Sequence, residues 1–259
     1  MASKNDKPDE VKFSNKSILE LMDKKKFDSA EIVCNELLKL NSTDKWLMGR
    51  KAKIFAEKGK YNDSEIILDS LTKRFPEDSS LVFLHAMVLQ FLGRPNDELR
   101  NLLFLSRMGS KSTNLYNQIG FVYHTLKQYD SAFYYCSKAI NIDHKNYEAY
   151  NNKGLSEAGM GRYAESIGDF NIAISLNDNF ELCYFNRGSS FFSLGKFQEA
   201  IDDFSTAIRF NENNPRYYEG RGGAYLKLKM KDQGCKDIQK AAKLGSSDAA
   251  QFLKSGSCN

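Results

Sequence analysis

Residues with the types and spacing needed for chemistry are sparse in this chain of 259 residues. Its three histidines, His85, His124 and His144, are too scattered in the sequence to suggest a metal or catalytic cluster. The adjacent carboxylates of Asp202 and Asp203 could act as an acid and a base only inside a cleft, and such pairs are more typical of a solvated helix face. We therefore expect no catalytic residue, no metal ion and no cofactor.

The segment GMGRYA at residues 159–164 satisfies the pattern G-x-G-x-x-A of dinucleotide-binding proteins. That pattern binds phosphate when it follows a strand, whereas the sequence before residue 159 is typical of a helix. We expect both glycines to lie in a turn between two helices.

The cysteines include no C-x-x-C pair and no spacing that fits a metal site. We expect Cys34 and Cys136 to be buried as small apolar side chains, and Cys258 to be the one reactive thiol, in a flexible tail. This use of cysteine fits a reducing compartment, and we expect a cytoplasmic protein.

Charge and hydropathy exclude several classes of protein. The 37 basic and 33 acidic residues nearly cancel, which is too balanced for the basic surface of a nucleic-acid-binding protein. No run approaches the roughly 20 apolar residues that span a bilayer, and the first residues lack the apolar stretch of a signal peptide. Four prolines among many Leu, Ala, Lys and Glu residues predict an all-α chain.

The elements that would position any binding residue come from an internal repeat with a period of 34 residues. Four glycines recur at this interval, each preceded four residues earlier by a tyrosine. The glycines are Gly120, Gly154, Gly188 and Gly222, and the tyrosines are Tyr116, Tyr150, Tyr184 and Tyr218.

The segments AYNNKGLSEAGMGRYAESIGDFNIAISLN and CYFNRGSSFFSLGKFQEAIDDFSTAIRFN resemble the tetratricopeptide-repeat (TPR) family. The matching positions are Gly188, Phe191, Gly195, Phe197, Ala200, Phe204 and Ala207. The resemblance implies a right-handed superhelical solenoid of helix-turn-helix units. Seven repeats fit the sequence, at residues 11–44, 45–78, 79–112, 113–146, 147–180, 181–214 and 215–248.

The ends of the chain fall outside this array. We expect a disordered segment at residues 1–10, and a capping helix with a frayed tail at residues 247–259. The stretch GCKDIQKAAKLGSSDAAQFL resembles Sel1-like and bacterial TPR endings.

Positions within each repeat, numbered 1 to 34, have distinct physical roles. A small residue at position 8, such as Gly188, lets the two helices of a repeat approach closely, and a glycine at position 15, such as Gly195, ends the first helix. Repeat 3 departs from the pattern, with Pro95 at position 17 and Glu98 at position 20. We expect its second helix to start late and to pack loosely.

First-helix residues not used for packing within a repeat should line a concave groove. The groove alternates amides with aromatic rings, and the rings should supply most of the affinity because burying one Phe contributes about 1.5–3 kcal/mol, against about 1 kcal/mol for a net hydrogen bond. The side chains that we expect to contact a partner are Trp46, Arg50, Phe83, Met87, Asn117, Gln118, Phe121, Asn151, Asn152, Phe185, Asn186, Ser189 and Phe192.

The amides allow two interpretations. Asn152 and Asn186 share position 6, which resembles the asparagine ladder with which the TPR part of O-linked N-acetylglucosamine transferase holds peptide backbones. Alternatively, each amide satisfies a neighbouring helix.

The repeats fill 238 of 259 residues and leave no room for a catalytic domain, so an enzyme is not expected. The resemblance favours a non-catalytic scaffold or adaptor that binds a peptide or helix of a partner protein in the groove. Two alternatives are a secretion or cell-envelope assembly factor that works at a membrane, and a carbohydrate or nucleic-acid reader. The sequence does not determine an oligomeric state.

Overall fold

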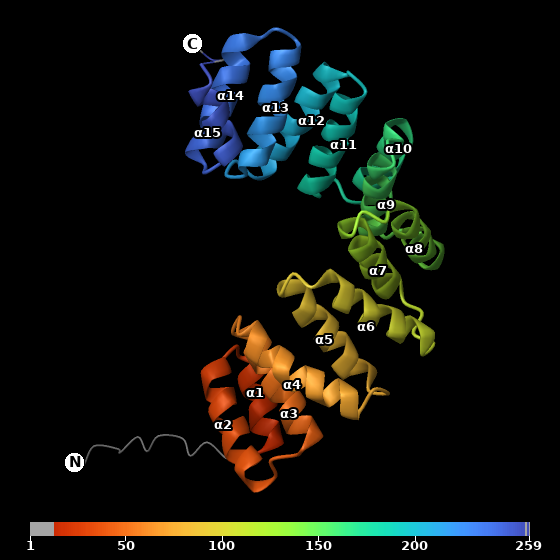
Figure 1. Cartoon of the computed structure of the whole chain (residues 1–259), viewed down its shortest axis with the longest axis vertical. Helices are drawn as coiled ribbons and strands as arrows, with labels where there is room; N and C mark the ends of the chain where they lie inside the picture. The colour runs from red at the N-terminus through yellow and green to blue at the C-terminus, as the bar shows by residue number, and fades with distance from the viewer. Residues whose placement is uncertain (1–12, 257, 259) are drawn as a thin grey trace, which may run out of the picture. The chain divides into compact units, whose positions relative to one another are not determined.

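The computed structural model describes residues 13–256 and residue 258. The predicted disordered segment 1–10 lies outside these residues. The described residues form fifteen α-helices and no strand (Figure 1), so the all-α prediction is confirmed. Fourteen of the helices form seven consecutive pairs, and the fifteenth follows the last pair.

The first helices of the seven pairs are α1 (Asn15–Asp23), α3 (Lys45–Glu57), α5 (Ser79–Phe91), α7 (Thr113–Thr125), α9 (Tyr147–Gly159), α11 (Glu181–Ser193) and α13 (Pro215–Lys227). The second helices are α2 (Phe27–Leu40), α4 (Tyr61–Arg74), α6 (Pro95–Arg107), α8 (Tyr129–Ile142), α10 (Tyr163–Leu176), α12 (Phe197–Phe210) and α14 (Lys231–Lys243). The last helix is α15 (Ser247–Lys254).

The chain divides into two compact units, Met1–Ser110 and Lys111–Asn259. The first contains α1 to α6, which is repeats 1 to 3, and the second contains α7 to α15. Within each unit every helix packs against the next one along the chain. The predicted array of repeats at residues 11–248 is uninterrupted, whereas the structure divides it after Ser110.

Local sequence explains where the helices begin. A Ser, Asp or Asn side chain precedes six of the seven first helices and accepts a hydrogen bond from a backbone N–H of the first turn. Such caps contribute about 1 kcal/mol each because they satisfy an otherwise unpaired donor. The capping residues are Ser14, Asp44, Asp78, Ser112, Asn146 and Asn214.

The turn inside each repeat requires a left-handed backbone at position 15. Four repeats place glycine there, including Gly161 with φ of 79° and Gly195 with φ of 76°. The other three place a lysine there, namely Lys25, Lys127 and Lys229. The turn between α9 and α10 comprises residues 160–162, so Gly161 lies in it as predicted, whereas Gly159 is the last residue of α9 and that part of the prediction is wrong.

The close approach predicted at position 8 is confirmed. A methyl group added to Gly120 would lie 2.4 Å from the sulfur of Cys136, and one added to Gly154 would lie 2.9 Å from the ring of Phe170. Both distances are shorter than van der Waals contact, so only glycine fits between these helices.

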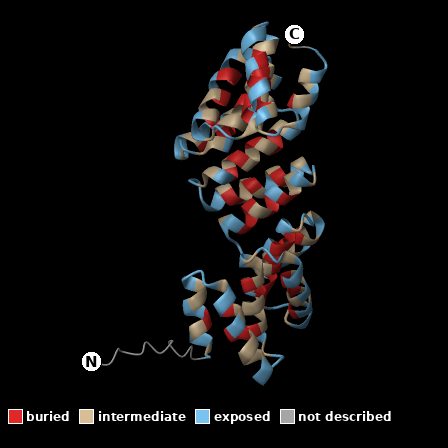
Figure 2. Cartoon of the chain, turned by 90° about the vertical axis from the view of Figure 1, so that its left-hand side faces the viewer, coloured by how far each residue is buried: buried red, intermediate tan, exposed pale blue. Residues whose placement is uncertain are grey.

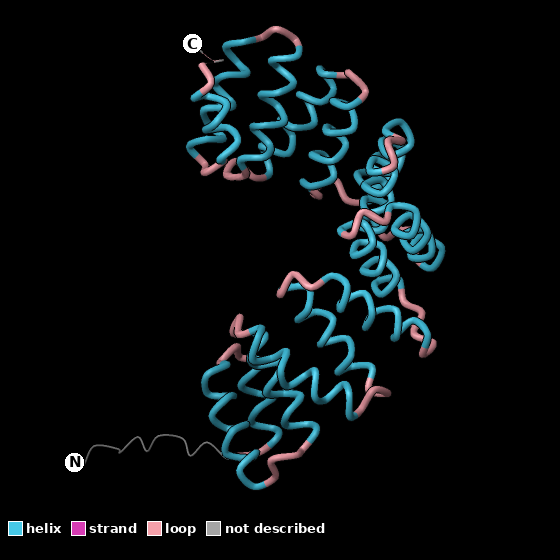
Figure 3. Tube along the Cα trace, in the orientation of Figure 1, coloured by secondary structure: helices cyan, strands magenta, loops and turns pink. Residues whose placement is uncertain are grey.

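The core lies between successive helices of each unit, where the buried residues gather in Figure 2. In the first unit Ile18, Val33 and Ile54 are fully or almost fully buried, and in the second unit Phe170 and Phe204 are. The helices are joined by short loops (Figure 3).

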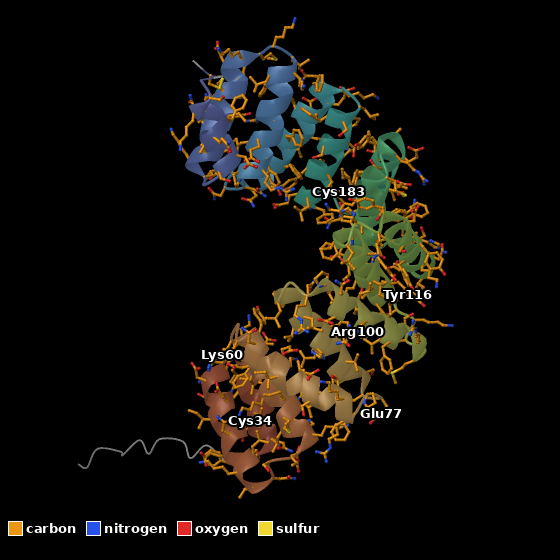
Figure 4. The ribbon with its side chains drawn as sticks, viewed as in Figure 1. Cys34, Lys60, Glu77, Arg100, Tyr116 and Cys183 are labelled. Carbon is orange, nitrogen blue, oxygen red and sulfur yellow. A yellow bond between two sulfur atoms is a disulfide. The ribbon has the colours of Figure 1, made fainter. Side chains whose placement is uncertain are left out.

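The cysteines of the core are unreactive. Cys34 and Cys136 are fully buried, as predicted, and so is Cys183 (Figure 4 labels Cys34 and Cys183). Burial raises the pKa of the Cys34 thiol to about 11, and those of Cys136 and Cys183 to about 12. Thiols with such pKa values are protonated at neutral pH and behave as apolar side chains.

The expectation for repeat 3 is wrong. Its second helix, α6, begins at Pro95, the same repeat position at which every other second helix begins. Proline suits the first position of a helix because its fixed φ matches and its missing N–H has no partner there. The helix also packs tightly, with Leu102 and Leu105 only 1% and 3% exposed. Glu98 is buried with it, at 6% exposure.

The expectation for the C-terminal tail is also wrong in one respect. Cys258 is not a free thiol in this structure but forms a disulfide with Cys235 of α14. The helix α15 packs back onto α14 and α13 through Ala249 and Phe252, which brings Cys258 to α14. The inference of a reducing compartment rested on unpaired cysteines, and it loses that support.

Candidate partner-binding groove

A groove of about 920 Å³ lies in the first unit, between α3 and α5, and is also lined by Tyr61, the first residue of α4. Four predicted site residues line it together, because residues three or four apart share one face of a helix. From α3 come Trp46 and Arg50, and from α5 come Phe83 and Met87.

The apolar side of the groove is formed mainly by α5. Met87 and Phe91 are 40% and 61% exposed, and Leu84, one turn before Met87, also lines the groove. The ring of Phe91 stacks on the ring of Tyr61, with centroids 4.6 Å apart and planes 3° from parallel. Tyr61 was missed as a groove residue, because its position in the repeat marks it as the start of a second helix.

Cations lie on the α3 side of the same groove. The ammonium of Lys45 is 2.9 Å from the carboxylate of Asp78, which raises the pKa of Lys45 and lowers that of Asp78. The guanidinium of Arg50 lies over the ring of Trp46, 5.1 Å from its centre. Within the described residues neither Arg50 nor Lys53 forms an ion pair with a carboxylate, so both charges are available to a ligand.

The other nine predicted site residues lie in the second unit, on α7, α9 and α11. Four of them bind one another. The amide nitrogen of Asn152 donates to the oxygen of Asn117 at 2.9 Å, and the nitrogen of Asn186 donates to the oxygen of Asn151 at 2.9 Å. Asn151 in turn donates to Asn152 at 3.2 Å.

These hydrogen bonds link the first helices of repeats 4, 5 and 6. They agree with the interpretation that each amide satisfies a neighbouring helix. Asn117 and Asn151 are also buried, at 7% and 5% exposure. Binding of a peptide backbone by these side chains stays a prediction.

Phe185 and Phe192 of α11 pack against α12 of their own repeat, and Phe185 also packs against α13 of the following repeat. Phe185 lies 5.2 Å from the ring of Tyr217 and 5.6 Å from that of Phe204, and Phe192 meets the edge of Phe197 at 5.3 Å.

The other three predicted residues of the second unit are Gln118, Phe121 and Ser189. The hydroxyl of Ser189 donates to the backbone oxygen of Phe185 at 2.9 Å. Phe121 is 39% exposed, and Gln118 is half-buried.

The other candidate functional features of the sequence have structural roles or no counterpart among the described residues. Asp203 is buried and accepts two hydrogen bonds from the guanidinium of Arg187, at 2.8 and 2.6 Å, so it belongs to an ion pair and not to a catalytic dyad. The described residues contain no group of three His, Cys, Asp or Glu side chains placed to hold a metal ion. None of the helices that they form has the length and apolar character needed to cross a bilayer.

Comparison with known proteins identifies the class of this fold. A family model described as "TPR repeat" matches residues 188–229, and one described as "Tetratricopeptide repeat" matches residues 113–146. No curated protein sequence matches the chain.

Solved structures give the same fold at low sequence identity. A tetratricopeptide-repeat protein from Parabacteroides merdae is 21% identical, with a TM-score of 0.77 over 92% of this chain and 95% of that one. PilF of Pseudomonas aeruginosa is 14% identical, with a TM-score of 0.65 over 82% of this chain and 97% of that one. YrrB, described as a TPR protein with an unusual peptide-binding site, is 15% identical, with a TM-score of 0.56 over 69% and 93%.

The helix pairs, the period of 34 residues and the two matching models define an all-α repeat protein. The chain is a tetratricopeptide-repeat protein. Repeats of this family indicate a scaffold for protein–protein interaction. Neither matching model covers residues 230–259, so the Sel1-like resemblance of the ending stays a prediction.

Proposed function

We propose that this protein is a non-catalytic scaffold that binds an extended or helical segment of a partner protein in the groove between α3 and α5. The observation that carries the proposal is the size and lining of that groove. Its volume of about 920 Å³ accommodates several side chains of a ligand, and the exposed apolar side chains of Met87 and Phe91 line it along α5. YrrB, a structural relative, is itself described as having a peptide-binding site.

The lining also indicates the chemistry of the segment. Met87 and Phe91 offer apolar surface, and burying one large apolar side chain of the partner there contributes about 1.5–3 kcal/mol. Arg50 and Lys53 add two positive charges on the opposite side. We therefore propose an amphipathic segment with bulky apolar residues along one side and Asp or Glu residues along the other.

A displayed peptide library selected on the full chain tests this proposal. We expect enrichment of segments that combine Asp or Glu with Leu, Phe or Trp. The affinity of the best peptide for the wild-type chain should fall roughly tenfold with Phe91→Ala. It should fall to a similar extent with Arg50→Glu, and a peptide carrying Lys in place of its acidic residue should then bind better than the original.

Leu40→Ala provides the matched control, because Leu40 is an exposed apolar residue of the same unit, 85% accessible, outside the groove. It should leave the affinity unchanged. Selected peptides whose binding is insensitive to both Phe91→Ala and Arg50→Glu would disprove the groove as the binding site.

A further inference from the structure

A second cavity, of about 270 Å³, lies in the first unit between α4, α5 and α6. It shares no lining residue with the groove between α3 and α5. It is lined by the buried residues Val82, His85 and Leu89 of α5 and by charged residues of α4 and α6.

His85 leaves an unsatisfied hydrogen-bond acceptor in this cavity. Its Nδ1 is 3.2 Å from the hydroxyl oxygen of Thr72, and that hydroxyl donates its hydrogen to the backbone oxygen of Leu68 at 2.8 Å. The Thr72 oxygen can then only accept from His85, so Nδ1 carries the ring proton and Nε2 is an unprotonated acceptor. Burial lowers the pKa of His85, which keeps the ring neutral.

No donor reaches this acceptor from the described residues. His85 is 6% exposed, and its Nε2 is buried without a hydrogen bond. The Oε1 of Glu65 lies 3.9 Å from Nε2 and is another acceptor, which already accepts one hydrogen bond from Nη1 of Arg94 at 3.0 Å. A carboxylate oxygen can accept more than one hydrogen bond, so a donor with several hydrogens could satisfy Nε2 and also bind Oε1 of Glu65.

Asn101 of α6 is the second unsatisfied group that lines the cavity. Its Nδ2 is buried and makes no hydrogen bond. A rotation of 180° about the bond between Cβ and Cγ exchanges Nδ2 and Oδ1, and it would place Oδ1 in the cavity as a further acceptor.

Repeats 6 and 7 show which group occupies the equivalent place elsewhere in this chain. The guanidinium of Arg187 lies between Asp203, 16 residues later, and Asn171, 16 residues earlier, with a distance of 2.6 Å to each. Arg221 is placed in the same way between Asp237 and Ser205, at 2.7 and 3.0 Å.

The same spacing in repeat 3 gives Asp69, His85 and Asn101, and all three line the cavity. The imidazole of His85 is shorter than an arginine side chain and carries no positive charge when neutral. The place that a guanidinium fills in repeats 6 and 7 therefore lies open in repeat 3.

We propose that this cavity receives the guanidinium group of an arginine side chain from a partner protein. The group would donate to Nε2 of His85, to Oε1 of Glu65 and to the carboxylate of Asp69. Asp69 is available, because its present ion pair with Lys73 is a surface pair whose side chains are 45% and 74% exposed. The aliphatic stem of the arginine would pack on Leu89 and Phe104.

Arginine fits this cavity better than lysine. A guanidinium has five donors in one plane, whereas an ammonium is a compact charge with three. The acceptors come from three different helices, so a planar, branched donor can meet more of them at once. Of the arginines that line the cavity, Arg94 is paired with both Glu65 and Asp97, and Arg100, labelled in Figure 4, is paired with Asp97.

The test titrates the full chain with Nα-acetyl-arginine methylamide while the imidazole signals of His85 are followed by NMR. The citrulline derivative is the matched ligand control, because its side chain has the same shape and no charge. The lysine derivative is a second control, because it has the positive charge but not the planar guanidinium group. We expect the arginine derivative to shift the Nε2 signal and to bind roughly tenfold more tightly than either control. Equal effects of all three ligands, as from a cavity that holds only water, would overturn the proposal.

A double variant supplies the protein control. His85→Arg with Asn101→Asp reproduces the ion pair that repeats 6 and 7 contain, so the chain's own guanidinium should fill the cavity and arginine binding should fall at least roughly tenfold. Asp69→Asn should also weaken binding, and it decides the question if the double variant does not fold. Retention of wild-type affinity by either folded variant would contradict the site.

The groove variant Arg50→Glu separates this proposal from the proposed function. It removes a groove cation and lies outside the cavity, so it should leave arginine binding unchanged. Loss of arginine binding in Arg50→Glu would show that the ligand binds in the groove and would overturn the inference.

Discussion

Lys127, in the turn between α7 and α8, adopts the same left-handed backbone as Gly161 in the corresponding turn of the next repeat, with φ of 58° and 79°. A side chain at such a φ costs about 1–2 kcal/mol, while glycine pays only the larger entropy of its unfolded state. Position 15 thus requires this conformation whether or not glycine occupies it.

Lys127→Gly should therefore raise the free energy of unfolding, by about 0.5–1 kcal/mol. Chemical denaturation followed by circular dichroism measures the change. Lys145→Gly is the control, because Lys145 is an exposed lysine of the second unit whose φ is not positive, and it should not stabilise the protein. A decrease in stability for Lys127→Gly would show that the lysine side chain makes a contact that outweighs the strain.

The amide network of the second unit should contribute measurably to its stability. Asn151→Ala removes the acceptor of Asn186 and the donor to Asn152, and it leaves the Asn186 nitrogen without its partner. The expected loss is about 1–3 kcal/mol, as for a buried polar group that loses its hydrogen bond. A double-mutant cycle of Asn151→Ala with Asn186→Ala measures the coupling between the two side chains.

Gln118→Ala serves as the comparison for this network, because Gln118 is half-buried and is not part of it. Its effect should stay within about 0.5 kcal/mol. A coupling energy near zero between Asn151 and Asn186 would mean that the amides are free to bind a ligand instead of each other.

Much of the fold could be predicted because it depends on local spacing. A glycine at position 8 indicates a close contact between two helices, and a glycine at position 15 indicates a left-handed turn. Both positions recur every 34 residues. The start of α6 at Pro95 was mispredicted because the missing aromatic residue was given more weight than the preference of proline for the first helical position.

The site was predicted less well, because spacing along one helix does not report contacts between repeats. Trp46 and Met87 fall in the groove as expected, but whether Asn152 faces a ligand or Asn117 depends on the distance between two helices. The pairing of Cys258 with Cys235 likewise depends on how α15 folds back. The cavity beside His85 depends on the packing of three helices, and its likeness to the ion-pair sites of repeats 6 and 7 depends on contacts between repeats.

Glu98→Ala should stabilise the protein at neutral and higher pH. Glu98 is buried in a position that is Ala, Ser or Gly in the other repeats, and burial raises the pKa of its carboxyl group from 4.5 to about 7. Because the folded pKa exceeds the unfolded one, the wild-type protein loses stability as the pH rises from about 4.5 to about 7. The variant lacks this loss.

The expected gain is about 2 kcal/mol at pH 8 and much smaller at pH 5. Thermal unfolding of both proteins across this range measures it. Glu77→Ala is the control, since Glu77 is exposed, and its effect should be small at both pH values. A gain for Glu98→Ala that is independent of pH would show that Glu98 destabilises the fold by its volume and not by its charge.

Reduction of the disulfide between Cys235 and Cys258 should loosen the C-terminal cap. The bridge joins residues 23 apart and encloses α15, so it restricts the unfolded chain and should contribute about 2–4 kcal/mol. Cys258→Ser should therefore increase hydrogen exchange in α15 and lower the thermal midpoint of the oxidised protein. Dithiothreitol should produce the same shift in the wild type and no further shift in Cys258→Ser, because Cys34, Cys136 and Cys183 are free thiols. An additional effect of the reductant on the variant would point to a second bridge, and equal exchange in α15 with and without the bond would show that packing of Ala249 and Phe252 alone holds the cap.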